Sequence, residues 1–240
     1  LRDERDVEDS AFPEIEISTG PDNTIAGGIG RFDQANRLDQ DLFEFNNDFT
    51  YVLGDHNLTF GTNNKFFQFD NLFIQDFFGS YTFESFETPD GEEVSALEAF
   101  RRGQPASYQF SFATPAAGTD RPEANFKALQ FAGYVQDEWE PTSNLRLTLG
   151  ARLDVPVVPD EPTFNPTAFE AFGRSTSDVA SGNPLFSPRF GVNYENDLLL
   201  DDRSTQIRGG LGIFTGDVPF VWVSNQFTNT GADVNRIDAD

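Results

Sequence analysis

Residues that commonly perform acid–base, nucleophilic or metal chemistry are scarce in this 240-residue chain. It has no cysteine, and its one histidine, His56, lies in the segment Gly-Asp-His-Asn, which is typical of a tight turn. Zinc sites and His-based nucleophilic triads require Cys or His side chains that this sequence does not supply. We therefore expect His56 to be a solvated turn residue and not a catalytic base or metal ligand.

Carboxylates are abundant, with 40 Asp and Glu residues, but their spacing indicates no particular site. A pair of the kind that hydrolyses glycosides could be drawn from them, yet no pair stands out. Asp33, Asp39 and Asp41 lack the spacing of a helix-loop-helix calcium site, and looser calcium binding by loop carboxylates stays open. The segments "GGIG" (27–30) and "RGGLG" (208–212) lack the features of phosphate loops and are interpreted as strand glycines. The sequence thus predicts no enzyme, no cofactor, and no catalytic or metal-binding residue.

Composition restricts the class of protein further. The formal net charge of −24 argues against nucleic-acid binding, which needs clustered Lys and Arg. Acid-rich, lysine-poor chains suit high salt, although solvated acidic loops explain the same composition. No apolar run reaches the roughly 18 residues of a spanning helix. The chain also lacks methionine, which predicts an internal fragment or a processed piece, with a trimmed mature protein as the alternative.

Strict alternation in residues 131–155, "FAGYVQDEWEPTSNLRLTLGARLDV", predicts a β-hairpin. In its second arm every second residue from Leu145 to Val155 is apolar, whereas Arg146 and Arg152 belong to the opposite, polar set. The first arm repeats the pattern less strictly, with Asp137 as the one charge on the apolar side. The segment "EPTSN" between the arms has turn residues. One face of this hairpin is therefore expected to be apolar and the other polar.

Similar patterns recur along the chain. Residues 42–53 and 57–69 predict a second hairpin with arms of about a dozen residues, longer than usual globular strands. Residues 187–195 and 205–216 predict a third, separated by the turn region "NDLLLDDRS". A further strand is expected near Ile25–Phe32 and another in the final segment, "PFVWVSNQFTNTG" (219–231).

The connections at one end of the predicted strands are expected to be much shorter than those at the other end. Short turns of about four, five and eight residues lie within the hairpins, whereas residues 70–128 and 156–186 are predicted long loops and residues 1–24 a connection or loop. Within 70–128 we expect short strands near Tyr81–Phe86 and Tyr108–Phe112 and a helix near Glu92–Arg101. Short periplasmic turns, long extracellular loops and 27 phenylalanines favour an all-β fold, an antiparallel transmembrane β-barrel, over a soluble β-sandwich.

The segments "YVQDEW", "NLRLTLGARLDV", "SPRFGVNYE" and "IRGGLGIFTGDVP" resemble the barrel of TonB-dependent outer-membrane receptors. Together with "NNDFTYVLGDHNLTFGTNNKFFQFDNLFIQDFFGSYTF", they resemble more narrowly the Oar-like group, whose precursors carry a carboxypeptidase-regulatory-like domain. The resemblance covers about residues 25–227. It implies that residues 1–240 are part of a single receptor barrel domain, with the plug domain, the coupling box and the terminal assembly strand missing.

What this resemblance implies is uptake of an unidentified small-molecule or peptide ligand across the bacterial outer membrane. The implied partners are outer-membrane lipid and an inner-membrane energy-coupling complex that acts through the plug. In this arrangement the leucines of 145–155 face lipid, Trp139 lies at the interface, and Asp137 reaches lipid headgroups. "FFGSYTFESF" (77–86) is the best candidate for a ligand-contacting surface, although packing among these aromatics is favoured and the ligand-binding residues are unknown. The alternatives are a structural or adhesive outer-membrane barrel and a secreted soluble sandwich.

Overall fold

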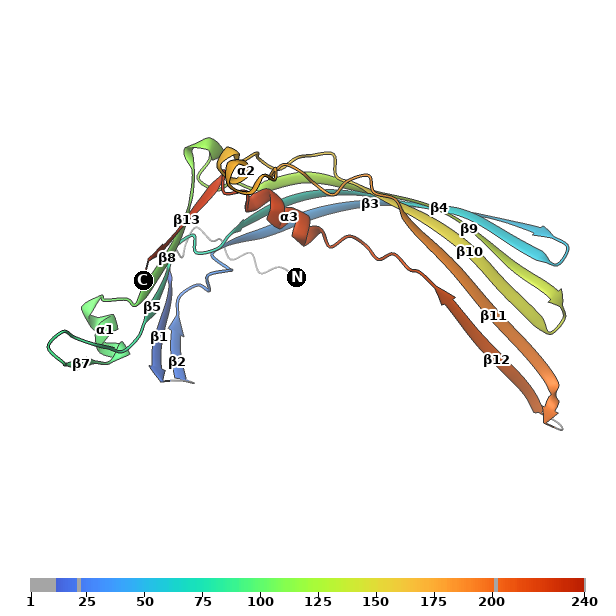
Figure 1. The fold of residues 1–240 in the computed structure, drawn as a ribbon, viewed down its shortest axis with the longest axis horizontal. Helices are drawn as coiled ribbons and strands as arrows, with labels where there is room; N and C mark the ends of the chain where they lie inside the picture. The colour runs from blue at the N-terminus through green and yellow to red at the C-terminus, as the bar shows by residue number, and fades with distance from the viewer. Residues whose placement is uncertain (1–11, 21–22, 201–202, 240) are drawn as a thin grey trace.

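The structure is a computed structural model that describes residues 12–20, 23–200 and 203–239, and the side chains of 196–204 are not considered. Six long antiparallel strands form its main sheet, in the order β12-β11-β10-β9-β4-β3. Figure 1 shows them as one curved sheet whose short turns gather at one end. The strands are β3 (Ala35–Leu53), β4 (His56–Ile74), β9 (Ala124–Thr142), β10 (Leu145–Val157), β11 (Leu185–Leu200) and β12 (Arg203–Gly212).

All three predicted hairpins are confirmed, and most of their strands are longer than expected, although β12 ends at Gly212, before the predicted end at residue 216. β3 and β4 pair from Ala35↔Ile74 to Leu53↔His56, so that only Gly54 and Asp55 separate them. β11 continues to Leu200, and much of the expected turn "NDLLLDDRS" is therefore strand. The prediction of an eight-residue turn was wrong because backbone pairing continued through residues that sequence composition marked as a turn.

A second, five-stranded sheet lies at the other end of the molecule, in the order β13-β8-β5-β1-β2 (Figure 1). All its neighbours are antiparallel except β1 and β5, which are parallel. Its strands come from segments far apart in sequence: β1 (Glu14–Gly20), β2 (Asn23–Gly27), β5 (Ser80–Phe83), β8 (Ser107–Ala113) and β13 (Val234–Ala239). β5 and β8 confirm two predicted short strands within the loop 70–128.

Residues 1–24 do not form only the predicted connection, because β1 occupies Glu14–Gly20 and β2 begins at Asn23; residues 1–11 lie outside the described residues. The strand expected near Ile25–Phe32 ends at Gly27, and Gly28 has a φ of +91°, which turns the chain. "GGIG" is thus the end of a strand and a turn, whereas "RGGLG" lies within β12 as predicted.

Short elements complete the long loops. The expected helix is α1 (Ala96–Arg102), where Ser95 caps the N-terminus and Gly103, at φ 64°, ends the helix. β6 (Phe86–Glu87) and β7 (Glu93–Val94) form a two-stranded sheet beside it. The loop that follows β8 has a 3₁₀ turn at Pro115–Ala117, and the loop after β10 has α2 (Pro166–Phe172).

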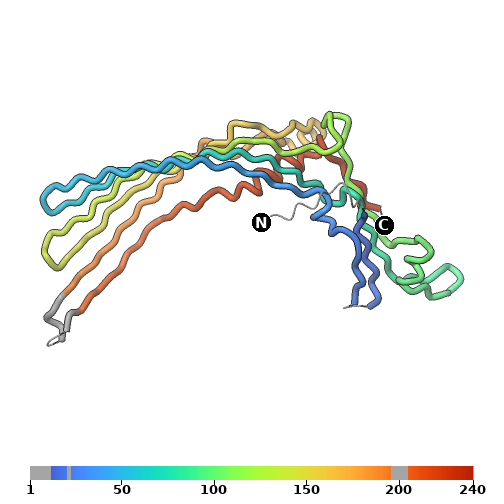
Figure 2. Tube along the Cα trace, turned by 180° about the vertical axis from the view of Figure 1, so that it is seen from behind, coloured from blue at the N-terminus to red at the C-terminus, as the bar shows by residue number. Residues whose placement is uncertain are grey.

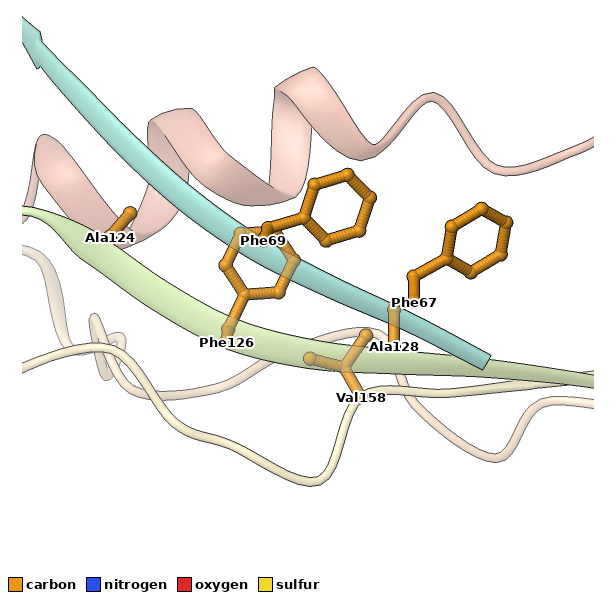
Figure 3. Close-up of a cluster of buried hydrophobic side chains, with 6 residues drawn as sticks. All are labelled: Phe67, Phe69, Ala124, Phe126, Ala128 and Val158. Carbon is orange, nitrogen blue, oxygen red and sulfur yellow. The ribbon is translucent and has the colours of Figure 1, made fainter. Parts of the chain in front are cut away.

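The final predicted strand, within 219–231, is instead the helix α3 (Phe220–Thr228). Its β-branched and aromatic residues suggested a strand, but Phe220, Val223 and Phe227 share one helical face. That face packs on a buried cluster from β4, β9 and the start of the loop after β10. Figure 3 shows this cluster beneath the helix: Phe67, Phe69, Ala124, Phe126, Ala128 and Val158.

Aromatic contacts hold α3 on the sheet. The Phe220 ring centroid lies 4.7 Å from that of Phe67 and 5.2 Å from that of Phe69, and Phe227 stacks on Phe126 at 4.7 Å. In addition, Asn71 of β4 donates a 2.5 Å hydrogen bond to the buried Ser224 hydroxyl. Tertiary burial therefore overrides the local strand preference of this segment.

Candidate functional site: a sheet with one apolar and one polar face

The register of the main sheet aligns apolar residues of all six strands on one face, which we call the outer face. Phe49 of β3 is paired with Phe60, Phe60 with Val135, and Val135 with Ala151. The next row joins Tyr51, Leu58, Asp137, Leu149, Phe190 and Leu211. The alternation predicted within each hairpin thus becomes one surface that crosses all six strands. It is mainly apolar and is interrupted by Asn47, Thr62 and Asn64 as well as by Asp137.

This outer face is exposed, because within the described residues no second layer covers it. Phe43 is 65% exposed, Phe49 61% and Leu211 74%. A β-sandwich would bury these side chains against a second sheet about 10 Å away. An apolar surface of this extent instead indicates a membrane or an interface with another protein.

Polar and charged residues limit the apolar band at both ends. On β3 the band extends from Phe43 to Leu53, which corresponds to about 25 Å of membrane if strands rise about 3.3 Å per residue and tilt about 40°. Beyond Phe43, Arg37 forms ion pairs with Asp39 at 3.3 Å and with Glu123 at 2.6 Å. The band therefore has the height of the apolar belt of an outer-membrane barrel.

At the short-turn end, the band finishes in a cluster of His56, Asp137 and Trp139. The His56 ring stacks on the Trp139 indole at 5.5 Å, and its Nδ1 lies 2.7 Å from Asp137 Oδ2. The aromatic side chain expected at this interface is therefore present. Asp137, which was expected to reach headgroups, has its Oδ2 engaged by His56, and no third acidic or histidine side chain in the described region joins them to form a metal site.

The opposite, inner face bears a polar network at mid-height. The Tyr134 hydroxyl donates a hydrogen bond to Asp48 across the intervening β4 strand. The ring can cross β4 because residue 61 is glycine: a Cβ there would overlap the Tyr134 ring and lie 2.5 Å from Asp48 Oδ1. Arg152 stacks over the same tyrosine, with its Cζ 5.7 Å from the ring centroid.

Arg152 also neutralises a buried carboxylate. Its Nη2 lies 2.8 Å from Oδ1 of Asp154, whose side chain is 1% exposed, and 3.4 Å from Asn63 Oδ1. Towards the loops, Lys65 donates to Asp217 at 2.8 Å and 2.9 Å. A paired ionic network of this kind suits a hydrated lumen better than an apolar core.

Both predicted inner-face arginines lie on the polar face. Arg152 is at the centre of the network, whereas Arg146 is at the short-turn end, where its Nε donates to Glu140 at 2.8 Å. The sequence did not single out Asp48, Tyr134 or Gly61. Only the pairing of β3, β4 and β9 brings these three together.

The aromatic segment 77–86 is largely packed inside the five-stranded sheet, as was favoured. Phe83 is buried and meets the Phe100 ring of α1 edge-on at 5.2 Å, and Tyr81 stacks on Tyr108 at 4.6 Å. Burial, followed by the neighbouring Tyr81, raises the pKa of Tyr108. Phe77 lines an open groove of about 600 Å³ together with Phe110 and Phe112. The segment thus leaves only part of its aromatic surface accessible to a ligand.

Among the described residues, no three His, Asp or Glu side chains converge as metal ligands, and Asp33, Asp39 and Asp41 form no such group. Separately, no helix in the described part of the chain is both long enough and apolar enough to cross a membrane.

Comparison with known proteins identifies the class that this sheet defines. The chain matches the family model described as "Outer membrane beta barrel domain" over residues 3–237. It therefore belongs to the outer membrane beta barrel family and is a protein of the bacterial outer membrane. No curated protein and no solved structure matches it.

Proposed function

We propose that this chain is part of the barrel of a TonB-dependent outer-membrane receptor, and that it contributes to energised uptake of a ligand without being an enzyme. The observation that supports this most directly is the two-faced sheet, apolar outside and ionically paired inside. Outer-membrane lipid would contact the outer face, and a hydrated lumen would contact the network around Tyr134 and Arg152. The lumen is the space that a plug domain occupies in such receptors.

The unequal ends of the sheet support a receptor role further. At one end two residues separate β3 from β4, whereas the five-stranded sheet lies at the other end of the long strands (Figure 2). Large, ordered loops held on a rigid scaffold are where binding residues concentrate. A structural or adhesive barrel would share the strands and is the second candidate, because nothing in the sheet itself requires an energy source.

Uptake can be separated from simple barrel function by genetics in the source bacterium. Cells that depend on the intact gene for growth on a scarce nutrient should lose that growth when the inner-membrane energy-coupling genes are deleted. Surface binding of the nutrient should persist in that deletion strain. Growth that is unaffected by loss of the energy-coupling complex would leave the structural or adhesive barrel as the better description.

A further inference from the structure

A pocket of about 370 Å³ lies at the loop end of the main sheet, where the end of β4, the C-terminal half of α3, and β13 meet. Its volume lies within the range of small-molecule sites. Most of its polar lining consists of amides and hydroxyls. The polar side chains that line it are those of Gln75, Ser111, Asn225, Thr228, Asn229, Asn235 and Arg236.

The amides in this pocket have free hydrogen-bonding capacity. Among the described residues, no side-chain hydrogen bond engages Gln75, Asn225, Asn229 or Asn235, although most polar side chains around them are paired. Each amide can donate two hydrogen bonds and accept at least one. Side chains that both donate and accept suit hydroxyl groups, which also do both.

The one charged residue in the pocket is already neutralised. Arg236 Nε lies 3.5 Å from the fully buried Asp76 Oδ2, and its Nη2 donates to Asp238 at 2.9 Å. Asp76 also accepts from Arg31 at 2.9 Å. A carboxylate or phosphate would therefore find no unpaired cation here, and the chain's net charge of −24 would repel it. These charges favour an uncharged ligand.

An exposed indole lies on the same helix as two of the amides, just outside the residues that line the pocket. Trp222 is 71% exposed and shares the solvent side of α3 with Asn225 and Asn229, because residues three and seven apart lie on one helical face. Trp222 is about 4.5 Å along the helix axis from Asn225. The opposite side of α3 is anchored on the sheet by Phe220 and Phe227, which fixes the helix backbone that carries the indole and two of the amides.

We propose that this pocket binds one end of a neutral oligosaccharide, with the amides engaging its hydroxyls and with Trp222 stacking on a sugar ring that extends beyond the pocket along α3. The assignment rests on the proposed receptor function, for which it names the class of ligand. An uncharged peptide is the nearest competitor, since its backbone also donates and accepts. The saccharide is favoured because an exposed aromatic beside adjacent amides matches a ring whose face is apolar and whose edge bears hydroxyls.

The test is calorimetric titration of the intact full-length protein in detergent. The probes are cellohexaose, laminarihexaose, maltohexaose and mannohexaose, with hexagalacturonic acid and an uncharged hexapeptide for comparison. At least one neutral hexasaccharide should bind, and the combined Asn225→Ala and Asn229→Ala change should weaken it about tenfold or more. Trp222→Ala should weaken binding and reduce the ligand-induced change in tryptophan fluorescence.

Asn57→Ala is the matched control, because Asn57 is an exposed amide at the opposite end of β4 and its loss should leave binding unchanged. Absence of binding to every neutral probe, preferential binding of the acidic sugar or the peptide, or unchanged binding in the Asn225/Asn229 variant would overturn the proposal. Binding in detergent needs no energy source. A negative result would thus reject this pocket alone, whereas failure of energised growth would reject the proposed uptake alone.

Discussion

An arginine placed at the middle of the outer face should destabilise the protein in proportion to its depth in the membrane. Val135 lies in the row of Phe49 and Phe60, near the middle of the apolar band, and is 41% exposed. Val135→Arg should therefore cost about 2–4 kcal/mol of unfolding free energy, the cost of Arg at the bilayer midplane. Gln136→Arg is the matched control, since this neighbour points to the polar inner face beside Glu138.

The structure also predicts how the cost changes with position. Leu147, another apolar residue of the outer face, pairs with Trp139 in the row of His56, close to the short turns. It lies four residues along β10 from the partner of Val135, or about 10 Å nearer the interface. Leu147→Arg should accordingly cost only about 0–1 kcal/mol.

Equilibrium unfolding by urea in lipid vesicles, with the intact protein, measures these differences. The expected order of destabilisation is Val135→Arg, then Leu147→Arg, then Gln136→Arg. If Val135→Arg and Gln136→Arg cost the same, the outer face does not contact hydrocarbon. If Leu147→Arg costs more than Val135→Arg, the position assigned to the band is wrong.

Three further substitutions test other parts of the structure. Gly61→Ala should cost about 1–2 kcal/mol of unfolding free energy, because the added methyl group displaces the Tyr134 ring that crosses β4. Gly133→Ala is the control and should cost less, because a Cβ there meets no atom within 4 Å. Urea unfolding measures both variants. Asp76→Asn should cost about 2–4 kcal/mol, because it leaves two arginines without their buried partner, and faster proteolysis of the loop sheet should report it. Phe220→Ala should weaken the packing of α3 on the sheet by about 2–3 kcal/mol, which would be measured as faster hydrogen exchange in the helix. Val221→Ala, on the exposed side of the helix, should leave that exchange unchanged.

Each of these predictions has a result that contradicts it. Equal effects at the two glycines would mean that the tyrosine does not need the space above β4. Asp238→Asn serves as the control for Asp76→Asn, because Asp238 is an exposed partner of Arg236, which also pairs with Asp76. Equal rates of proteolysis in the two variants would mean that the buried ion pairs of Asp76 do not stabilise the loop sheet. Unchanged exchange in α3 after Phe220→Ala would mean that the helix is held elsewhere.

Much of the main sheet followed from the sequence, because a strand imposes a period of two that is visible in its own residues. The alternation from Leu145 to Val155 correctly separated the two faces before any partner strand was known. The sequence also located the three hairpins and the long loops between them. It failed for α3, where strand-forming residue types concealed the helical spacing of Phe220 and Phe227.

The tertiary structure alone decided the features that depend on residues far apart in the chain. Asp48, Gly61 and Tyr134 have no shared pattern, and only the register across three strands places them in contact. Similarly, β1 is ordered by β5, a strand some sixty residues away, and β13 completes the same sheet.

Local periodicity therefore determined which residues lie on opposite faces of the sheet. Long-range strand pairing determined which residues of different segments come into contact. The apolar band, with its amphipathic strands, belongs to the first kind, because each strand has the pattern by itself. The inner-face network, the docked α3 and the amide-lined pocket belong to the second. Their energies come from contacts between segments that the sequence separates by tens of residues, and no local pattern records such contacts.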